Sequence, residues 1–388
     1  MQLSETEKWV VDQIAAGADA YVDIVFPVEK RKIGAPFLEE LLGGELSGVK
    51  PHRNGIRIIG AIIEGSMDLS NAQISCDVWL KNCQFNGPVK FQHASFAGVI
   101  SLNESTFKAN TNFVGMKVGH SVFCNNATFE DTVTFAIAEI MGSLEAREAT
   151  FKKAVKFNGI KVRVAGDFEH AVFEGPVDFG LADFTWLDLS TAFWPKSRVQ
   201  FRMQGLTYKY VSAVPGNEVA SHEALLKLAD RSMYSADVYA NLEEFFLRQG
   251  YRADADRAFV MGKHRERQEN LHGLSWLGSW VLNLLVGYGR HPRQAMIPCA
   301  VFVTLGCILF ATEKMELQEK PNAGDPVRVY NRFWYSLGLF LPFVNLQTAE
   351  LWKPKTDQTF LRNYVRVHIL LGWILIPIVL AALTGLIK

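Results

Sequence analysis

A period of eleven residues organises the chain from Gly55 to Phe193. In each period a residue that is usually small is followed two positions later by a large apolar one, and a second pair begins six residues after the first. We call the series of first pairs the first track and the series of second pairs the second track. The second members of the first track are Ile63, Ile74, Phe85, Phe96, Phe107, Val118, Phe129, Ile140, Phe151, Val162, Phe173 and Phe184. Those of the second track are Leu69, Leu80, Phe91, Leu102, Phe113, Cys124, Phe135, Ala146, Phe157, Phe168 and Phe179. Self-similarity at a fixed period is the signature of a solenoid, whose repeats pack against their neighbours.

Each pair predicts a short strand with both of its members in the core, because alternate strand residues face opposite sides. Turn-forming pairs such as Asn86-Gly87 and Gly175-Pro176 separate these strands. Two repeats then complete one four-sided coil, and about six coils are expected between 55 and 193. The aromatic residues should stack in two columns. These are Phe85, Phe107, Phe129, Phe151 and Phe173, and Phe91, Phe113, Phe135, Phe157 and Phe179.

The segment from Ala127 to Ala138 spells the unit A-x-F-x-x-x-V-x-F-x-x. In this the repeat resembles the pentapeptide-repeat family, in an eleven-residue variant of its unit. The resemblance implies a β-solenoid fold, the right-handed quadrilateral β-helix, with α-helical caps at its ends. It says little about activity, because a solenoid is a scaffold for many functions.

One function that the resemblance to this family implies is mimicry of duplex DNA, which requires the solenoid to be a strongly acidic rod. Between 55 and 193 there are fifteen acidic and eleven basic residues, and the whole chain has no net formal charge. We therefore expect no nucleic-acid partner and no DNA mimicry. A candidate outward basic patch remains, although a solvated face is the commoner meaning of such charges. It comprises Lys152, Lys153, Lys156, Lys161 and Arg163.

No residue pattern indicates an enzyme. The five cysteines form no C-x-x-C pair, so no metal site is expected, and Cys83 and Cys124 on the tracks suit a reduced, cytosolic core. A glycine-rich dinucleotide motif, a haem motif and a local catalytic signature are all missing from the sequence. We expect no catalytic residues and no cofactor.

The segments on either side of the repeat should cover its open ends. Residues 1–54 are expected to form an N-terminal helical cap, with one helix starting near Ser4 and another running from Ala35 to Leu42. Residues 194–272 show helical spacing and are expected to form a helical hairpin that connects the repeat to the rest of the chain.

Residues 273–388 are expected to form a membrane segment. It should begin with an interfacial helix at 274–286, and charge-free stretches predict spans at 295–312 and 367–387, ~27 and ~32 Å long as helices. The apolar stretch 333–346 is short for a span and suits a re-entrant or interfacial helix. The residues assigned to the membrane interface are Lys263, Arg265, Arg267, Trp276, Trp280, Arg290, Arg293, Arg366 and His368.

The order of cap, repeat, hairpin and paired spans resembles bacterial pentapeptide-repeat membrane proteins, some of which carry an ion-channel-like C-terminal domain. The positive charges before residue 295 predict a cytoplasmic N-terminal side, hence a multi-pass protein of the bacterial inner membrane. Candidate pore or re-entrant residues are Pro342, Asn345 and Gln347, although no glycine-rich filter follows the short helix.

Two functions follow as hypotheses. The first is a membrane-anchored scaffold that displays the cytoplasmic rod to a protein partner, with self-association through the spans, where Gly306, Gly338 and Gly372 permit close contact. The alternative is an oligomeric, ion-channel-like pore gated by the rod.

Overall fold

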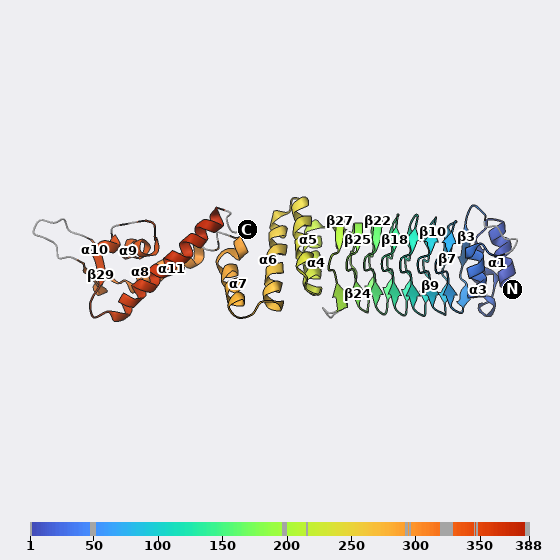
Figure 1. Cartoon of the computed structure of the whole chain (residues 1–388), viewed down its shortest axis with the longest axis horizontal. Coiled ribbons are helices and arrows are strands. Elements are labelled where there is room, and N and C mark those ends of the chain that lie inside the picture. The colour runs from blue at the N-terminus through green and yellow to red at the C-terminus, as the bar shows by residue number, and fades with distance from the viewer. Residues whose placement is uncertain are drawn as a thin grey trace, which may run out of the picture. The chain divides into compact units, whose positions relative to one another are not determined.

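The computed structural model describes residues 2–46, 52–195, 200–214, 216–291, 294, 296–318, 329–344, 346 and 348–384. The chain divides into two compact units, Met1–Phe259 and Val260–Lys388. The first unit is a β-solenoid of about seven turns with helices at both ends, and the second is helical (Figure 1).

The solenoid has four sides, which we number in chain order. Strands 22 residues apart pair in parallel on each side, so two eleven-residue repeats complete one coil, as predicted. Side 1 contains β2 (Lys32–Gly34), β4 (Ile62–Glu64), β8 (Gln84–Phe85), β12 (Thr106–Phe107), β16 (Thr128–Phe129), β20 (Thr150–Phe151) and β23 (Val172–Phe173). Side 2 contains β5 (Met67–Asp68), β9 (Val89–Lys90), β13 (Thr111–Asn112), β17 (Val133–Thr134), β21 (Val155–Lys156), β24 (Val177–Asp178) and β26 (Phe201–Arg202).

The other two sides join at the C-terminal end of the solenoid. Side 3 contains β6 (Gln73–Ile74), β10 (Ser95–Phe96), β14 (Lys117–Val118) and β18 (Glu139–Ile140). Side 4 contains β1 (Ala20–Tyr21), β3 (Ile56–Ile59), β7 (Val78–Lys81), β11 (Ile100–Ser101), β15 (Val122–Phe123) and β19 (Leu144–Glu145). Three longer strands run through both sides and merge them into one sheet, namely β22 (Lys161–Asp167), β25 (Asp183–Asp188) and β27 (Thr207–Ser212).

The core contains the two predicted columns of rings. On side 1, Phe85 and Phe107 stack with 4.6 Å between ring centroids and 2° between planes, and each later pair lies 4.8–5.2 Å apart. In the second column the rings from Phe113 to Phe179 stack, whereas Phe91 meets Phe113 edge-on at 67°. The ring spacing follows the spacing of paired strands, ≈ 4.7–4.9 Å, because each coil adds one strand and one ring.

Every eleventh residue has a positive φ, a conformation that the sequence analysis did not foresee. The series is Asn71, Asn82, His93, Glu104, Gly115, Asn126, Ile137, Glu148, Gly159, His170 and Leu181. At the first of these corners the Ala72 N–H donates to the Leu69 carbonyl at 3.0 Å, which closes a turn with the left-handed residue in its third position. Such a turn requires φ > 0 there, and it reverses the chain between two inward-facing pairs.

The N-terminal cap contains α1 (Glu5–Ala15), α2 (Val22–Val25), η1 (Val28–Lys30) and α3 (Ala35–Gly43). The predicted start of α1 is confirmed, since Ser4 accepts from the Glu7 N–H and Glu7 accepts from the Ser4 N–H. In α3, Phe37, Leu38 and Leu41 are buried, and Gly44 ends the helix with φ 73°. The cap also adds β1 and β2 to the ladders of sides 4 and 1.

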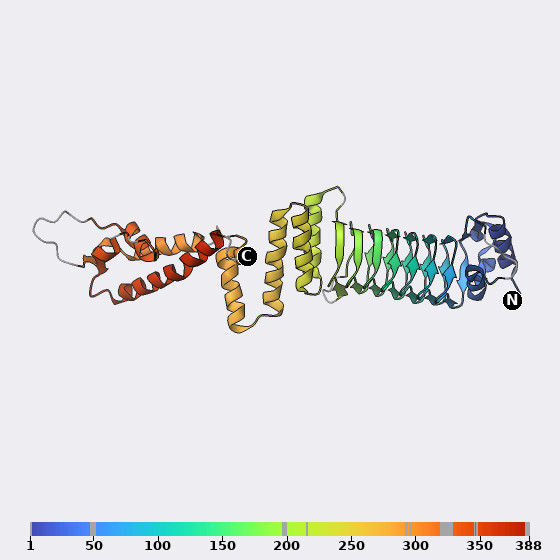
Figure 2. The same ribbon diagram turned by 45° about the horizontal axis from the view of Figure 1, so that its top comes forward.

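After the last coils come α4 (Glu218–Arg231), α5 (Ala236–Arg248) and α6 (Arg252–Glu269), and Figure 2 shows α4 and α5 lying across the end of the sheets. Asn241 and Arg248 of α5 donate to the carbonyls of Leu206 and Tyr208 at 2.9 and 3.3 Å. These bonds satisfy carbonyl groups at the end of the solenoid, where no further coil supplies partners.

The second unit contains α7 (Gly273–Val286), η3 (Gly287–Gly289), α8 (Met296–Leu309), η5 (Thr312–Lys314), β28 (Met315–Leu317), α9 (Arg332–Phe340), α10 (Thr348–Leu351), β29 (Trp352–Pro354) and α11 (Thr359–Leu383). Among the described helices, α11 alone is long and apolar enough to cross a membrane, whereas two full-length spans were predicted. The shorter α8 has 14 residues, or ~21 Å. It ends at Leu309 because the chain then turns into β28, which pairs with β29 ahead of α11.

Candidate functional site

The predicted basic patch does not lie on one face of the solenoid. Lys152 follows β20 on side 1, Lys156 lies in β21 on side 2, and Lys161 and Arg163 lie in β22. All of these side chains, with Lys153, are exposed. The cations therefore point in several directions, which does not suit recognition of one extended anionic partner.

Most of these cations are paired with a carboxylate of an adjacent coil. Lys152 lies 3.1 Å from Glu130, Lys161 lies 3.7 Å from Glu139, and Arg163 lies 3.7 Å from Asp183. The same pattern recurs elsewhere on the solenoid, as in Lys90–Asp68. Opposite charges that face each other on neighbouring strands add a small stabilising free energy to the pairing of those strands. These contacts support the alternative that the sequence left open, a solvated face.

Apolar residues instead gather at the corner between sides 3 and 4, on four successive coils. We call this set the outer ridge: Met141, Val164, Trp186 and Tyr210, with exposed fractions of 60, 54, 51 and 46%. Trp186 and Tyr210 are direct partners in the β25–β27 register, and the Val164 N–H donates to the Gly142 carbonyl. The register shifts at Val164, so its neighbour Ala165 is the partner of Trp186. Exposed apolar side chains on successive coils mark an interaction surface better than scattered ones.

Sequence reasoning missed the outer ridge because it followed only the inward tracks. The signal was present, since these four large apolar residues occupy outward positions at intervals of 22–24 residues. The longer strands β22, β25 and β27 then bring them into one row.

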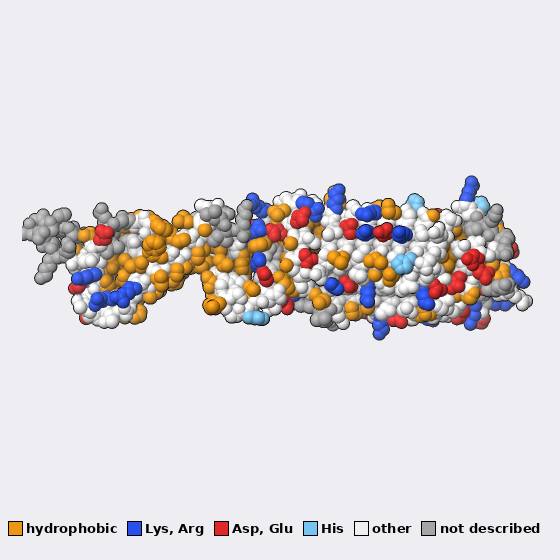
Figure 3. Space-filling model, viewed as in Figure 1, with side chains coloured by type: hydrophobic (Ala, Val, Ile, Leu, Met, Phe, Trp, Pro, Cys, Tyr) orange, Lys and Arg blue, Asp and Glu red, His pale blue; other side chains and the backbone are white. Residues whose placement is uncertain are grey.

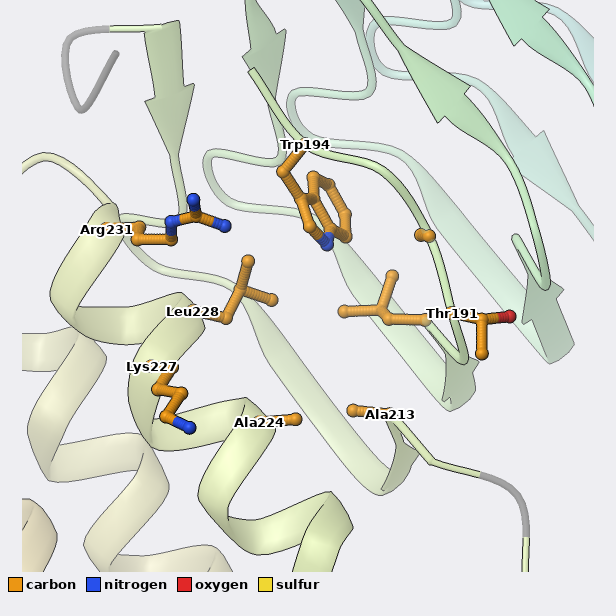
Figure 4. Close-up of a pocket in the computed structure, with 9 residues that line it drawn as sticks. Thr191, Trp194, Ala213, Ala224, Lys227, Leu228 and Arg231 are labelled. Carbon is orange, nitrogen blue, oxygen red and sulfur yellow. The ribbon is translucent and has the colours of Figure 1, made fainter. Parts of the chain in front are cut away.

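A hollow of about 260 Å³ lies between the end of the solenoid and α4 (Figure 4). We call it the end hollow. Its walls include Leu189, Trp194, Ala213, Ala224, Leu228 and Arg231. Trp194 continues the side 1 column of rings, stacking on Phe173 with 4.9 Å between centroids. The sequence analysis did not identify this feature, because it is built from the last coils and a helix that are distant in sequence.

In the second unit the surface is dominated by apolar side chains, as Figure 3 shows on one face. Trp276 and Trp280 of α7, which the sequence analysis assigned to the membrane interface, are each 43% exposed. Exposed apolar residues also cover α8, α9 and α11, including Ile297, Val301, Ile308, Phe333, Trp334, Val367, Leu370, Trp373 and Ile374.

The cations assigned to the membrane interface have different environments. Arg265 and Arg267 are buried within the protein. Arg265 lies 3.3 Å from Glu269, and Arg267 donates to the Tyr288 hydroxyl at 3.1 Å. Lys263 pairs with Glu266 at 2.8 Å. Arg290 is half-buried, Arg366 is exposed, and Arg293 lies outside the described residues.

His368, also assigned to the interface, is instead fully buried where α8, α9 and α11 meet. Its Nε2 lies 3.3 Å from Ser336 Oγ and 3.1 Å from the Ser336 carbonyl, and Ser336 Oγ donates to the Val303 carbonyl at 2.8 Å. The rings of Phe310 and Phe340 pack against it. The helices approach closely because Gly306 faces this cluster, and a Cβ there would lie 2.1 Å from Ser336 Oγ.

The predicted pore residues are only partly described. Pro342 follows the end of α9, while Asn345 and Gln347 lie outside the described residues. The pore hypothesis therefore stays a prediction.

The described residues contain no group of three or more His, Cys, Asp or Glu side chains that could hold a metal ion. The thiols of Cys83 and Cys124 are buried in the solenoid, and burial raises the pKa of each to about 12. A thiol with so high a pKa is not a nucleophile near neutral pH. Comparison of the chain with protein-family models, with curated proteins and with solved structures found no match.

Proposed function

We propose that this chain is a membrane-anchored pentapeptide-repeat scaffold, whose solenoid presents the outer ridge to a protein partner. The observation that carries the anchor is the environment of α11. The most apolar stretch within its segment Thr359–Ala381 has a mean hydropathy of 2.0, yet only 17% of that stretch is buried within the protein. A core helix of a water-soluble domain buries its apolar side chains, so this helix needs another apolar surrounding.

The surroundings of α11 support the same proposal. The tryptophans of α7 suit the boundary between lipid and water, where aromatic rings with one polar edge accumulate. Small residues lie at the helix contacts, and a Cβ on Gly372 would lie 2.0 Å from the Phe340 carbonyl oxygen. Helices in lipid pack through such small residues, because burying apolar surface gains little there.

For the solenoid, the outer ridge supports a protein as the partner. Its exposed aromatic and aliphatic side chains resemble the centre of a protein interface, where aromatic residues and Met are enriched. The neighbouring charges are already paired, for example Arg163 with Asp183. A bacterial inner-membrane location with the solenoid in the cytoplasm fits the five free cysteines.

The proposal is tested by placing a photo-crosslinking amino acid at Trp186 in full-length protein in cells. We expect one adduct of discrete mass in the membrane fraction, and its loss when Val164→Glu adds a charge to the outer ridge. A matched probe at the exposed side 3 position Lys117 should give no such adduct. Equal crosslinking from both positions, or an adduct that survives Val164→Glu, would contradict a specific partner at this surface.

A pore gated by the rod is the second candidate, and one arrangement favours it. The nine-residue α9 cannot cross a bilayer, yet it packs against both α8 and α11, as a re-entrant helix would. The test is ion flux in liposomes that contain the purified protein. Flux that is lost when Asn345 or Gln347 is substituted would favour the pore function over the anchor function.

A further inference from the structure

The end hollow has an aromatic wall at the end of a column of rings. Phe85, Phe107, Phe129, Phe151 and Phe173 stack in sequence, and Trp194 stacks on the last of them with 13° between planes. Trp194 also lines the hollow, where Figure 4 shows its ring extending toward Leu228. Another flat ring would continue the stack, and offset or parallel stacking is favourable at this spacing.

The rest of the wall is small and apolar. Ala213 and Ala224 face each other across the hollow from the end of the solenoid and from α4 (Figure 4), and Leu189 and Leu228 are each buried. Short side chains at these positions leave about 260 Å³ unfilled. This volume is just below the roughly 300–1,000 Å³ of drug-sized ligand pockets, so it suits only a small compound of one or two fused rings.

One cation at the hollow, Arg231, has no partner among the residues that the structure describes. The exposed Arg231 guanidinium lies beside Trp194 in Figure 4 and has no hydrogen bond or ion pair with any residue in the described part of the chain. Lys227, one turn earlier on α4, is already 3.7 Å from Glu223. A guanidinium presents a planar pair of N–H donors that matches a carboxylate, so Arg231 selects a ligand with one planar anionic group.

We propose that the end hollow binds a small planar aromatic carboxylate. Its ring stacks on Trp194 between Leu189 and Leu228, and its carboxylate accepts from Arg231. This site is separate from the outer ridge and from the membrane helices. Disproof of the site would therefore leave the proposed scaffold function untouched, and the reverse also holds.

The test is calorimetric titration of full-length protein in lipid nanodiscs with 2-naphthoate, using 2-naphthamide as the uncharged probe and empty nanodiscs as the blank. We expect saturable binding of naphthoate that weakens about tenfold in Arg231→Gln, because a charge-assisted bond contributes about 1.5–3 kcal/mol and 1.4 kcal/mol is tenfold. Binding of the amide should not change in that variant. Ala224→Leu, which fills the hollow, should abolish binding of both compounds.

Arg163→Gln is the matched control, since it removes an exposed arginine elsewhere on the solenoid and should leave naphthoate binding unchanged. Arg231→Gln is a surface substitution that keeps the test valid even if Ala224→Leu misfolds. The proposal is overturned if naphthoate does not bind saturably, or if its affinity is the same in Arg231→Gln as in the unsubstituted protein.

Discussion

The solenoid and the helical unit place their large and small side chains in opposite ways. In the solenoid the rings of Phe107 and Phe129 are buried in the core, while charged pairs such as Lys152–Glu130 lie outside. In the helical unit large apolar residues such as Trp373 lie outside, while Ser336 and His368 lie at the centre. This difference is what the proposed function rests on, because a unit with large apolar side chains outside and polar side chains at its centre suits lipid better than water.

The two arrangements also differ in what brings their elements together. Burial of rings drives coil stacking in the solenoid, at about 25 cal/mol per Å² of apolar surface removed from water. In the helical unit α8, α9 and α11 approach through Gly306, Gly372 and the Ser336 hydrogen bonds. Removing a large ring should therefore cost most in the core of the solenoid, and enlarging a small residue should cost most at the helix contacts of the second unit.

The largest effect should come from deleting a stacked ring. Phe129→Ala removes a fully buried ring with neighbours on both sides, and the cavity should cost about 3–5 kcal/mol of unfolding free energy. Phe333→Ala in α9, where the ring is 49% exposed, should change stability by less than about 1 kcal/mol. Denaturation followed by circular dichroism measures both. Equal losses of unfolding free energy in the two variants would contradict the proposed difference between the units.

The next effect should come from the tightest helix contact. Gly306→Val should force α8 away from Ser336 and cost about 1–3 kcal/mol, because a close-packed site cannot accept the added atoms. Gly278→Ala in α7 is the control, since nothing lies within 4 Å of the added Cβ, and it should stabilise that helix slightly. Thermal unfolding in detergent reports the difference. A Gly306→Val protein as stable as the control would show that α8 and α9 do not meet as described.

A smaller effect is expected at the solenoid corners. Gly115 has φ +64°, and an added Cβ would lie 2.4 Å from His93 Nδ1. Gly115→Ala should therefore cost about 1–2 kcal/mol. Ile137 holds φ 51° at an equivalent corner, so Ile137→Gly should be neutral or stabilising. Urea denaturation measures the change in unfolding free energy of each variant, and changes of opposite sign would support this explanation. A loss of stability in Ile137→Gly would contradict it.

The smallest effect should come from a surface ion pair. Lys152→Ala leaves Glu130 exposed to water, so stability should change by no more than about 0.5 kcal/mol and less at high salt. The same urea experiment at two salt concentrations measures this. A loss above 1 kcal/mol would mean that the coil-to-coil charge pairs contribute more than exposed pairs usually do.

Much of the solenoid could be predicted because its signal is repeated. The tracks that place Phe85 and Phe107 one coil apart recur often enough to determine the four-sided coil. The left-handed corners were missed because only some, such as Asn126, carry a residue typical of them, while Ile137 and Leu181 do not. There the stacking of neighbouring coils overrides the preference of the residue itself.

The candidate sites were harder to predict because they depend on contacts between distant residues. The burial of His368 against Ser336, for example, cannot be read from local spacing. The shortness of α8 has a similar cause, since charge-free sequence continues beyond Leu309 but the β28–β29 pairing ends the helix.

The central claim, that the exposed apolar face of α11 lies in lipid, is tested by adding one charge to it. Ile374 is 49% exposed, and Ile374→Arg should cost about 2.5–3.5 kcal/mol for insertion at the middle of a membrane span. The control is Ile24→Arg, at a residue of the first unit that is 76% exposed. We predict that alkaline extraction of membranes releases the Ile374→Arg protein and leaves the unsubstituted and Ile24→Arg proteins in the pellet. Release of all three proteins alike into the soluble fraction would contradict the account.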